Sequence, residues 1–210
     1  MDDARGGKSR LAEALTRVVA REGISGVSVR AVAAEAGVSG GAVQYHFPTR
    51  AEMVLYAMEW TSEQVEQRLS AVPRWGDVRE WTREILLELL PLDVDRHRQH
   101  AVWLAFIAHA ETDPKLADVK RQTNEKLRGM YSRIVRARRE LPVTDGTSTA
   151  SSPTASTGIE MDAPLLQSHV DGLSLQLAAL ELDEAIRVGP RLLDRYLVLA
   201  VDGPEKESEQ

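Results

Sequence analysis

The chain has 210 residues, of which 43% are hydrophobic and 28% charged, ordinary values for a globular protein with a substantial core. It contains no cysteine, which excludes disulfides, thiolate metal sites and a cysteine nucleophile. The polar first ten residues lack the apolar core of a signal peptide, and no run approaches 18 consecutive apolar residues. We therefore expect a cytoplasmic protein without a membrane span.

The net charge of −6 is unevenly distributed along the chain. Residues 1–50 contain seven basic and five acidic side chains, a net charge of +2, which leaves −8 for the remainder. Residues 1–50, called the head below, are thus mildly basic, and the rest of the chain is acidic. This distribution permits contact with DNA at one end of the chain only.

The hydrophobic residues recur with a helical period nearly throughout, and no stretch alternates for long enough to form a sheet. This pattern predicts an all-α fold of about nine helices. In chain order the helices are expected over residues 9–22, 28–36, 39–46, 49–72, 77–90, 97–112, 114–140, 164–180 and 183–201. Gly23 marks the end of the first helix, and Ser28, Thr49 and Asp113 are plausible N-caps.

Two segments are expected to lie outside the helical core. In residues 144–158, nine of fifteen side chains are Ser or Thr, a composition that buries too little surface to be ordered. It predicts a flexible loop. The charged residues 203–210 are expected to form a disordered tail.

Two short helices joined by the tight turn around Gly37 are typical of a helix-turn-helix, which places its second helix in the DNA major groove. Small residues at the start of that helix allow its backbone to approach base edges, and Gln44 can bind one base pair with two hydrogen bonds. Hydroxyl, basic and aromatic side chains nearby can reach phosphates. The predicted DNA-binding residues are Ser28, Arg30, Ser39, Gly40, Gly41, Ala42, Gln44, Tyr45, His46, Thr49 and Arg50.

Residues 28–53, SVRAVAAEAGVSGGAVQYHFPTRAEM, resemble the DNA-binding segment of the TetR family of bacterial transcriptional repressors. The family pattern is a helix ending in A-x-x-A-G-V-S, a small-residue recognition helix closing in an aromatic residue and Phe, then Pro-x-Lys/Arg. Its elements are residues 33–39, Gly41, Val43, His46, Phe47, Pro48 and Arg50. One position departs from the pattern, because Gln44 stands where the family most often has Tyr, with Tyr45 following it.

The resemblance implies three helices of helix-turn-helix, residues 1–50, followed by a larger helical domain, residues 51–202, that binds a small molecule and dimerises through its last two helices. Polar and aromatic residues on the central helices are the candidate ligand pocket: Trp103, Phe106, His109, Met130, His169, Asp171 and Gln176. Apolar residues of the last two helices are the candidate dimer interface, although a monomer core would leave the same pattern: Leu166, Val170, Leu173, Leu177, Leu192 and Tyr196.

The function implied is that of a ligand-responsive repressor, a homodimer that binds a pseudo-palindromic duplex operator and is released by a small, mostly apolar effector. A DNA-binding regulator without an effector, or one that acts as an activator or a corepressor-dependent repressor, fits the same residues. An enzyme is the remote alternative, because no catalytic constellation or phosphate loop is present. No cofactor and no metal are expected, since His97 and His100 beside two aspartates are a weak pattern.

Overall fold

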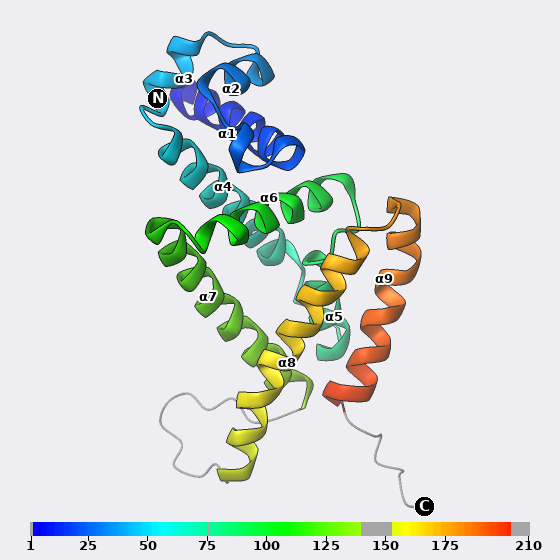
Figure 1. Cartoon of the computed structure of the whole chain (residues 1–210). Coiled ribbons are helices and arrows are strands. Elements are labelled where there is room, and N and C mark those ends of the chain that lie inside the picture. Colours follow the sequence, from blue (N-terminus) through cyan, green and yellow to red (C-terminus); the bar gives the residue numbers. More distant parts are fainter. Residues whose placement is uncertain (1, 75, 140–152, 203–210) are drawn as a thin grey trace, which may run out of the picture. The chain divides into compact units, whose positions relative to one another are not determined.

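The structure of the protein is a computed structural model that describes residues 2–74, 76–139 and 153–202 (Figure 1). Side chains are described for residues 7–74, 76–139 and 161–201. Nine α-helices, a 3₁₀ turn and a π-helical turn account for the described elements, among which there is no strand. The predicted all-α fold is therefore confirmed.

The helices follow one another with short connections. In chain order the elements are α1 Asp2–Glu22, the 3₁₀ turn η1 Ile24–Gly26, α2 Val29–Ala36, α3 Gly40–His46, α4 Arg50–Ala71, α5 Val78–Glu88, α6 Val94–Ala110, α7 Pro114–Arg138, α8 Pro153–Leu177, α9 Leu182–Tyr196 and the π-helical turn η2 Leu197–Asp202.

The chain forms two compact units. Unit 1 consists of Met1–Ser70 with Asp93–Lys120, and unit 2 consists of Ala71–Leu92 with Arg121–Gln210. Unit 1 thus contains the predicted helix-turn-helix together with helix α6. The functional boundary expected after residue 50 stays a prediction.

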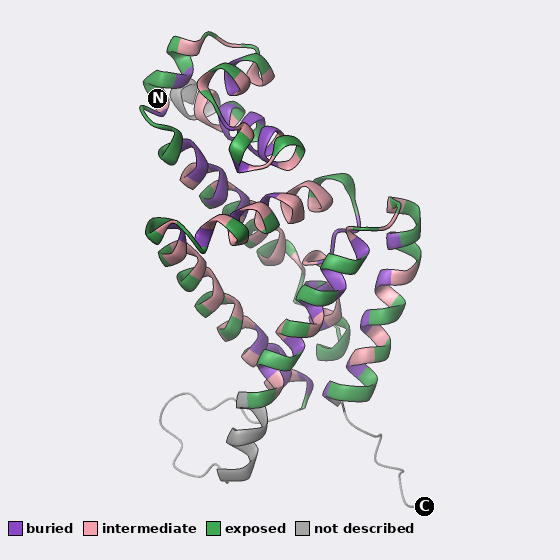
Figure 2. Ribbon diagram, in the orientation of Figure 1, coloured by how far each residue is buried: buried purple, intermediate pink, exposed green. Residues whose placement is uncertain are grey.

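Unit 1 has a single hydrophobic core that joins segments distant in the sequence (Figure 2). Its most buried side chains, each at most 3% exposed, include Leu15 and Val18 of α1, Val43 of α3, Phe47 after α3, and Phe106 of α6. Helix α6 packs against α1, so that the head shares its core with a helix some 80 residues further along the chain.

Helix starts coincide with the N-caps expected from the sequence. The hydroxyl of Ser28 accepts a hydrogen bond from the Ala31 amide at 3.1 Å, and that of Thr49 accepts one from the Glu52 amide at 3.2 Å. Asp113 accepts the amide of Lys115 at 2.9 Å. Local sequence chemistry therefore predicts where α2, α4 and α7 begin.

Three helices begin several residues earlier than predicted, among them α6, which starts at Val94 instead of residue 97. Helix α1 starts at Asp2 instead of residue 9. The prediction missed its first turns because they are polar and lack an apolar periodicity. Helix α8 starts at Pro153 instead of residue 164, so Pro164 lies inside it. A proline there removes one helical hydrogen bond, and the burial of Ala163 and Leu166 on either side offsets this loss. The predicted loop therefore ends before Pro153, and its residues 144–152, like the predicted tail, lie outside the described residues.

Unit 2 is held together by polar contacts as well as by its apolar core. Arg83 of α5 binds both carboxylate oxygens of Asp194 of α9, at 2.6 and 3.0 Å. Close packing also requires a glycine at position 189 of α9, because a Cβ there would lie 2.9 Å from the side chains of Leu177 and Leu92. These contacts connect α5, α8 and α9.

Candidate nucleic-acid interface

The turn between α2 and α3 is built on Gly37, whose φ of 67° is in the left-handed region that favours glycine. The amide of Val38 donates to the carbonyl of Ala33 at 3.0 Å, which closes the end of α2. Ser39 then caps α3 by accepting the amide of Ala42 at 3.2 Å. The backbone of the predicted helix-turn-helix is thus held by its own hydrogen bonds at both ends of the turn.

Helix α3 presents one buried face and one open face. Val43 is fully buried and the following Phe47 is 3% exposed. The other side carries Tyr45, which is 83% exposed, an unusual exposure for an aromatic side chain. The remaining exposed residues of this face are Gly41, Ala42 and Gln44. The predicted residues Gly41, Ala42 and Gln44 therefore share the face of α3 that the protein leaves uncovered, whereas Gly40 is half-buried near Val29.

The aromatic end of α3 is ordered by ring contacts. The rings of Tyr45 and His46 meet edge to face with centroids 5.1 Å apart, and Phe47 lies 5.0 Å from Tyr56 of α4. Tyr45 is therefore exposed and at the same time oriented by its neighbour. Such an arrangement suits a side chain that meets a partner with little loss of entropy.

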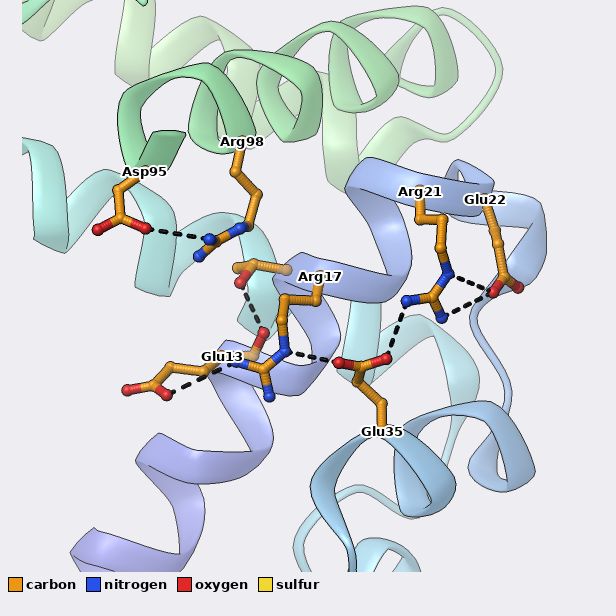
Figure 3. A network of polar contacts seen from close by, with 8 residues as sticks. Glu13, Arg17, Arg21, Glu22, Glu35, Asp95 and Arg98 are labelled. Atoms are coloured by element: carbon orange, nitrogen blue, oxygen red, sulfur yellow. Dashed lines mark hydrogen bonds and ion pairs between the residues drawn. The ribbon is translucent and has the colours of Figure 1, made fainter. Parts of the chain in front are cut away.

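An ion-pair network joins α1 to α2 (Figure 3). The carboxylate of Glu35 accepts from Nε of Arg17 at 2.6 Å and from Nη1 of Arg21 at 2.9 Å. These hydrogen bonds, that of Arg21 first, lower the pKa of Glu35. Arg17 also lies 3.8 Å from Glu13, and Arg21 pairs with Glu22. Both arginines are thereby neutralised by residues of the head itself.

Arg50 has a role inside the fold, and its predicted phosphate contact stays a prediction. Its Nε donates to the carbonyl of Val27 at 2.9 Å, and its Nη2 donates to the carbonyl of Ile24 at 2.7 Å. Arg50 thus ties the start of α4 to the turn η1. The sequence motif placed a cation here correctly, but the carbonyls that it binds become neighbours only in the folded head.

Replacement of Arg50 by methionine is expected to lower the free energy of unfolding by about 1–3 kcal/mol, since two hydrogen bonds from a charged donor are lost. Thermal unfolding measures the effect. Arg30→Met is the control, because Arg30 is exposed and forms no hydrogen bond or ion pair with the described residues. Equal stability of Arg50→Met and the wild type, with weaker DNA binding, would contradict the structural role and leave the phosphate contact as the role of Arg50.

The other predicted DNA contacts stand at helix starts. Ser28, Ser39 and Thr49 are exposed caps, and Arg30 lies exposed in the first turn of α2. A capping hydroxyl keeps a lone pair and a proton for a phosphate, next to amides that favour anions. Capping and phosphate contact are therefore compatible at these three positions.

The candidate pocket residues of α6 belong to unit 1. Phe106 is 1% exposed and forms part of the core that α6 shares with α1, so its packing accounts for the residue without a ligand, and its pocket role stays a prediction. Trp103 stacks on Phe106 with centroids 5.9 Å apart and is, like His109, half-buried. These two side chains keep some surface, and their pocket role stays a prediction.

The other candidate pocket residues belong to unit 2. His169 of α8 stacks on Tyr196 of α9 at 3.7 Å between ring centroids. Its Nε2 is buried and has no hydrogen-bond partner among the described residues, and burial lowers its pKa. Half-buried Met130 is followed on α7 by Tyr131, a buried residue that the sequence pattern missed. Gln176 is exposed, so a pocket role for it has no support in the packing of this unit.

Asp171 of α8 has an environment unlike that of an ordinary surface carboxylate. Although the residue is exposed, surrounding protein desolvates its carboxyl and raises its pKa, against a hydrogen bond from Gln167 that lowers it. Its negative charge in turn adds to burial in raising the pKa of Tyr131. Asp171 and Tyr131 are therefore electrostatically coupled neighbours.

Most of the predicted dimer residues are core residues of unit 2. Leu166, Val170, Leu173 and Leu177 are at most 5% exposed in the single chain, so they have almost no surface left for a partner. The sequence could not separate these alternatives, because α8 is apolar on two faces. Large apolar side chains that are exposed on α8 and α9 are Met161, Leu165, Leu175, Ile186 and Leu192. Among the predicted residues, only Leu192 belongs to this exposed set, and Tyr196 is half-buried against His169.

The aspartates beside His97 and His100 are bound to arginines. Asp93 caps α6 and pairs with Arg96 at 2.7 Å, and Asp95 pairs with Arg98 at 3.1 Å. Within the described residues, no group of three His, Asp or Glu side chains is arranged to hold a metal ion. These acidic residues stabilise the start of α6.

Comparison with known proteins gives a family match for each of two parts of the chain. Residues 11–57 match the family described as bacterial regulatory proteins, tetR family, and residues 78–199 match the family described as BetI-type transcriptional repressor, C-terminal. The second match alone covers more than half of the chain. The chain belongs to the TetR family.

Relatives agree with this membership. The regulator PksA of Bacillus subtilis is 35% identical over 112 residues, which are 53% of this chain and 55% of PksA, so the match spans about half the length of that relative. The structure of a Rhodococcus transcriptional regulator is 34% identical, with a TM-score of 0.70 over 90% of this chain and 95% of that one. A regulator from Saccharomonospora viridis, solved in complex with choline, has the same fold at 20% identity, with a TM-score of 0.73 over 94% and 96% of the two chains.

TetR-family proteins are transcriptional regulators, so membership confirms that this protein is a helix-turn-helix regulator and not an enzyme. Over the described ranges, every helix is too short or too polar to cross a bilayer.

Proposed function

We propose that this TetR-family protein is a repressor that binds a pseudo-palindromic operator as a homodimer and is released by a small, mostly apolar effector. The observation that carries the proposal is the open face of α3, with Gln44 and Tyr45 exposed beside the small residues Gly41 and Ala42. A helix without bulk at its start can lie deep in the major groove, where Gln44 reads a base edge. The match to a BetI-type repressor domain supports repression.

The proposed partner in the dimer is a second copy of the chain, bound through the uncovered row of α8. Met161, Leu165, Ser168, Gly172 and Leu175 follow one another at spacings of three or four residues, so they share one helix face. A Cβ at Gly172 would meet nothing within 4 Å in the chain, so the fold of one protomer does not require a glycine there. Close approach of a partner helix accounts for both the exposed apolar side chains and the glycine.

Asp171 and Tyr131 support the effector part of the proposal. A few polar groups among apolar walls give a small-molecule site its orientation, and the desolvated carboxyl of Asp171 and the buried phenol of Tyr131 are such groups in unit 2. The regulator of the same fold from Saccharomonospora viridis was solved with choline, a small organic molecule. Release requires the effector to favour the form of the dimer that does not bind DNA.

A regulator without an effector, or one that activates or needs a corepressor, shares the same DNA-reading face. The two possibilities differ only in the coupling between ligand and DNA binding. Selection from a random duplex pool at about 150 mM salt provides the first test. Enrichment of an inverted repeat supports the proposed dimer and yields a probe for compounds that release or promote binding. A lack of enrichment contradicts the proposal that the protein binds a specific operator without a corepressor.

Gln44→Ala is expected to relax base preference at one position in each half-site of the selected operator, at a cost of about 1–3 kcal/mol against the preferred base. Binding to a set of single-base operator variants measures it. Gln67→Ala, an exposed glutamine of α4, serves as the matched control and should bind all variants like the wild type. A uniform loss across all variants would instead make Gln44 a phosphate contact.

A further inference from the structure

The described head has few positive charges left for DNA. Arg17 and Arg21 pair with Glu13, Glu22 and Glu35, whereas Arg50 keeps its charge but uses two of its N–H donors for backbone carbonyls. Since phosphate neutralisation provides much of the affinity of a DNA-binding protein, other cations must lie near α3. Within the described side chains, those without an acidic partner in the head are Lys8, Arg10, Arg30 and Arg50.

Lys8 is held beside the end of α3 by aromatic rings. Its Nζ lies 4.2 Å from the ring centroid of Tyr56 and 5.9 Å from that of Phe47. The preceding residue is equally close to α3, because a Cβ at Gly7 would be 3.8 Å from Nε2 of His46. Figure 1 likewise shows the N-terminal end of α1 next to α3 within unit 1.

We propose that Lys8 is a further DNA contact, whose ammonium neutralises a backbone phosphate beside the end of α3 that carries Tyr45 and His46. This inference rests on the proposed function, and it extends the DNA-binding surface from α2 and α3 to the start of α1. Arg30 lies on α2, so Lys8 supplies positive charge at the opposite end of the recognition helix from the turn.

The ring contacts favour this role. An aromatic face attracts an ammonium without neutralising its positive charge, so the N–H donors of Lys8 that point away from the rings stay available to an anion. The two rings also restrict a side chain that is otherwise very flexible, which lowers the entropy lost when it meets a phosphate. A salt bridge to a carboxylate, as formed by Arg17, would instead neutralise the charge.

Lys8→Met tests the proposal, since methionine keeps an apolar stem against Tyr56 and Phe47 and removes the charge. The probe is a random-sequence 30-base-pair duplex, with affinity measured between about 50 and 200 mM salt, because phosphate contacts also operate without a specific sequence. The slope of log affinity against log salt should fall by about 1 for each protomer, and affinity at 100 mM salt should drop about 3–10-fold per protomer.

Two further variants make the result specific. Lys8→Arg should retain the wild-type slope, and Lys115→Met, which removes an exposed lysine at the start of α7 in the same unit, should also leave it unchanged. A lower melting temperature of Lys8→Met with an unchanged slope would show that Lys8 only pins α1 to α4, and would overturn the proposal. Absence of duplex binding by the wild type would instead refute the proposed function itself.

Discussion

Replacing Leu175 and Leu192 together by glutamate is expected to convert the homodimer into monomers and to weaken operator binding by about 10²–10⁴-fold. Both leucines are exposed in the single chain, at 55% and 47%, so glutamate should be tolerated in the folded protomer. In a dimer the same carboxylates would face an apolar partner surface without compensation. An operator bound by two linked recognition helices loses the advantage of the second helix once the link is broken.

Light scattering measures the mass, and binding to the selected operator measures the affinity. Val94→Glu, which charges an exposed apolar residue of α6 in unit 1, is the matched control and should remain dimeric. Melting curves show whether the variants fold. A folded double variant with the mass of two chains would refute the proposed interface while leaving the reading of DNA by α3 intact.

Phe106→Ala is expected to lower the free energy of unfolding by about 3–5 kcal/mol, because it removes a fully buried ring from the core that α6 shares with α1. Thermal or urea unfolding provides the measurement. Leu104→Ala, at a partly exposed position on the same helix, should have a much smaller effect. A stable Phe106→Ala protein that has lost only its response to an effector would contradict this core role and favour the predicted role in the ligand pocket.

The parts of the fold that sequence predicts best are those determined by neighbouring residues. Ser28, Ser39 and Thr49 cap the helices that follow them, and Gly37 forms the turn, since each of these roles depends on a span of a few residues. The open face of α3 is equally local, since Val43 and Phe47 are buried on its other side.

Contacts between distant segments were not predictable from such patterns. Arg50 binds carbonyls more than 20 residues away, and Phe106 enters a core built largely from the first 60 residues. When a helix has apolar residues on two faces, the sequence does not indicate which face packs into the core of its own chain. For this reason Leu166 and Leu165, adjacent in sequence, have opposite environments, one fully buried and the other 56% exposed.

The packing of α6 against α1 has a mechanical consequence. Close-packed interiors are stiff and transmit displacement instead of absorbing it. Since Val102, Phe106 and Ala110 are embedded in the core that α6 shares with α1, we expect a displacement of α6 to move α1 with it. The helix-turn-helix therefore needs no separate hinge to respond to a displacement of α6, because α6 is part of the same packed unit.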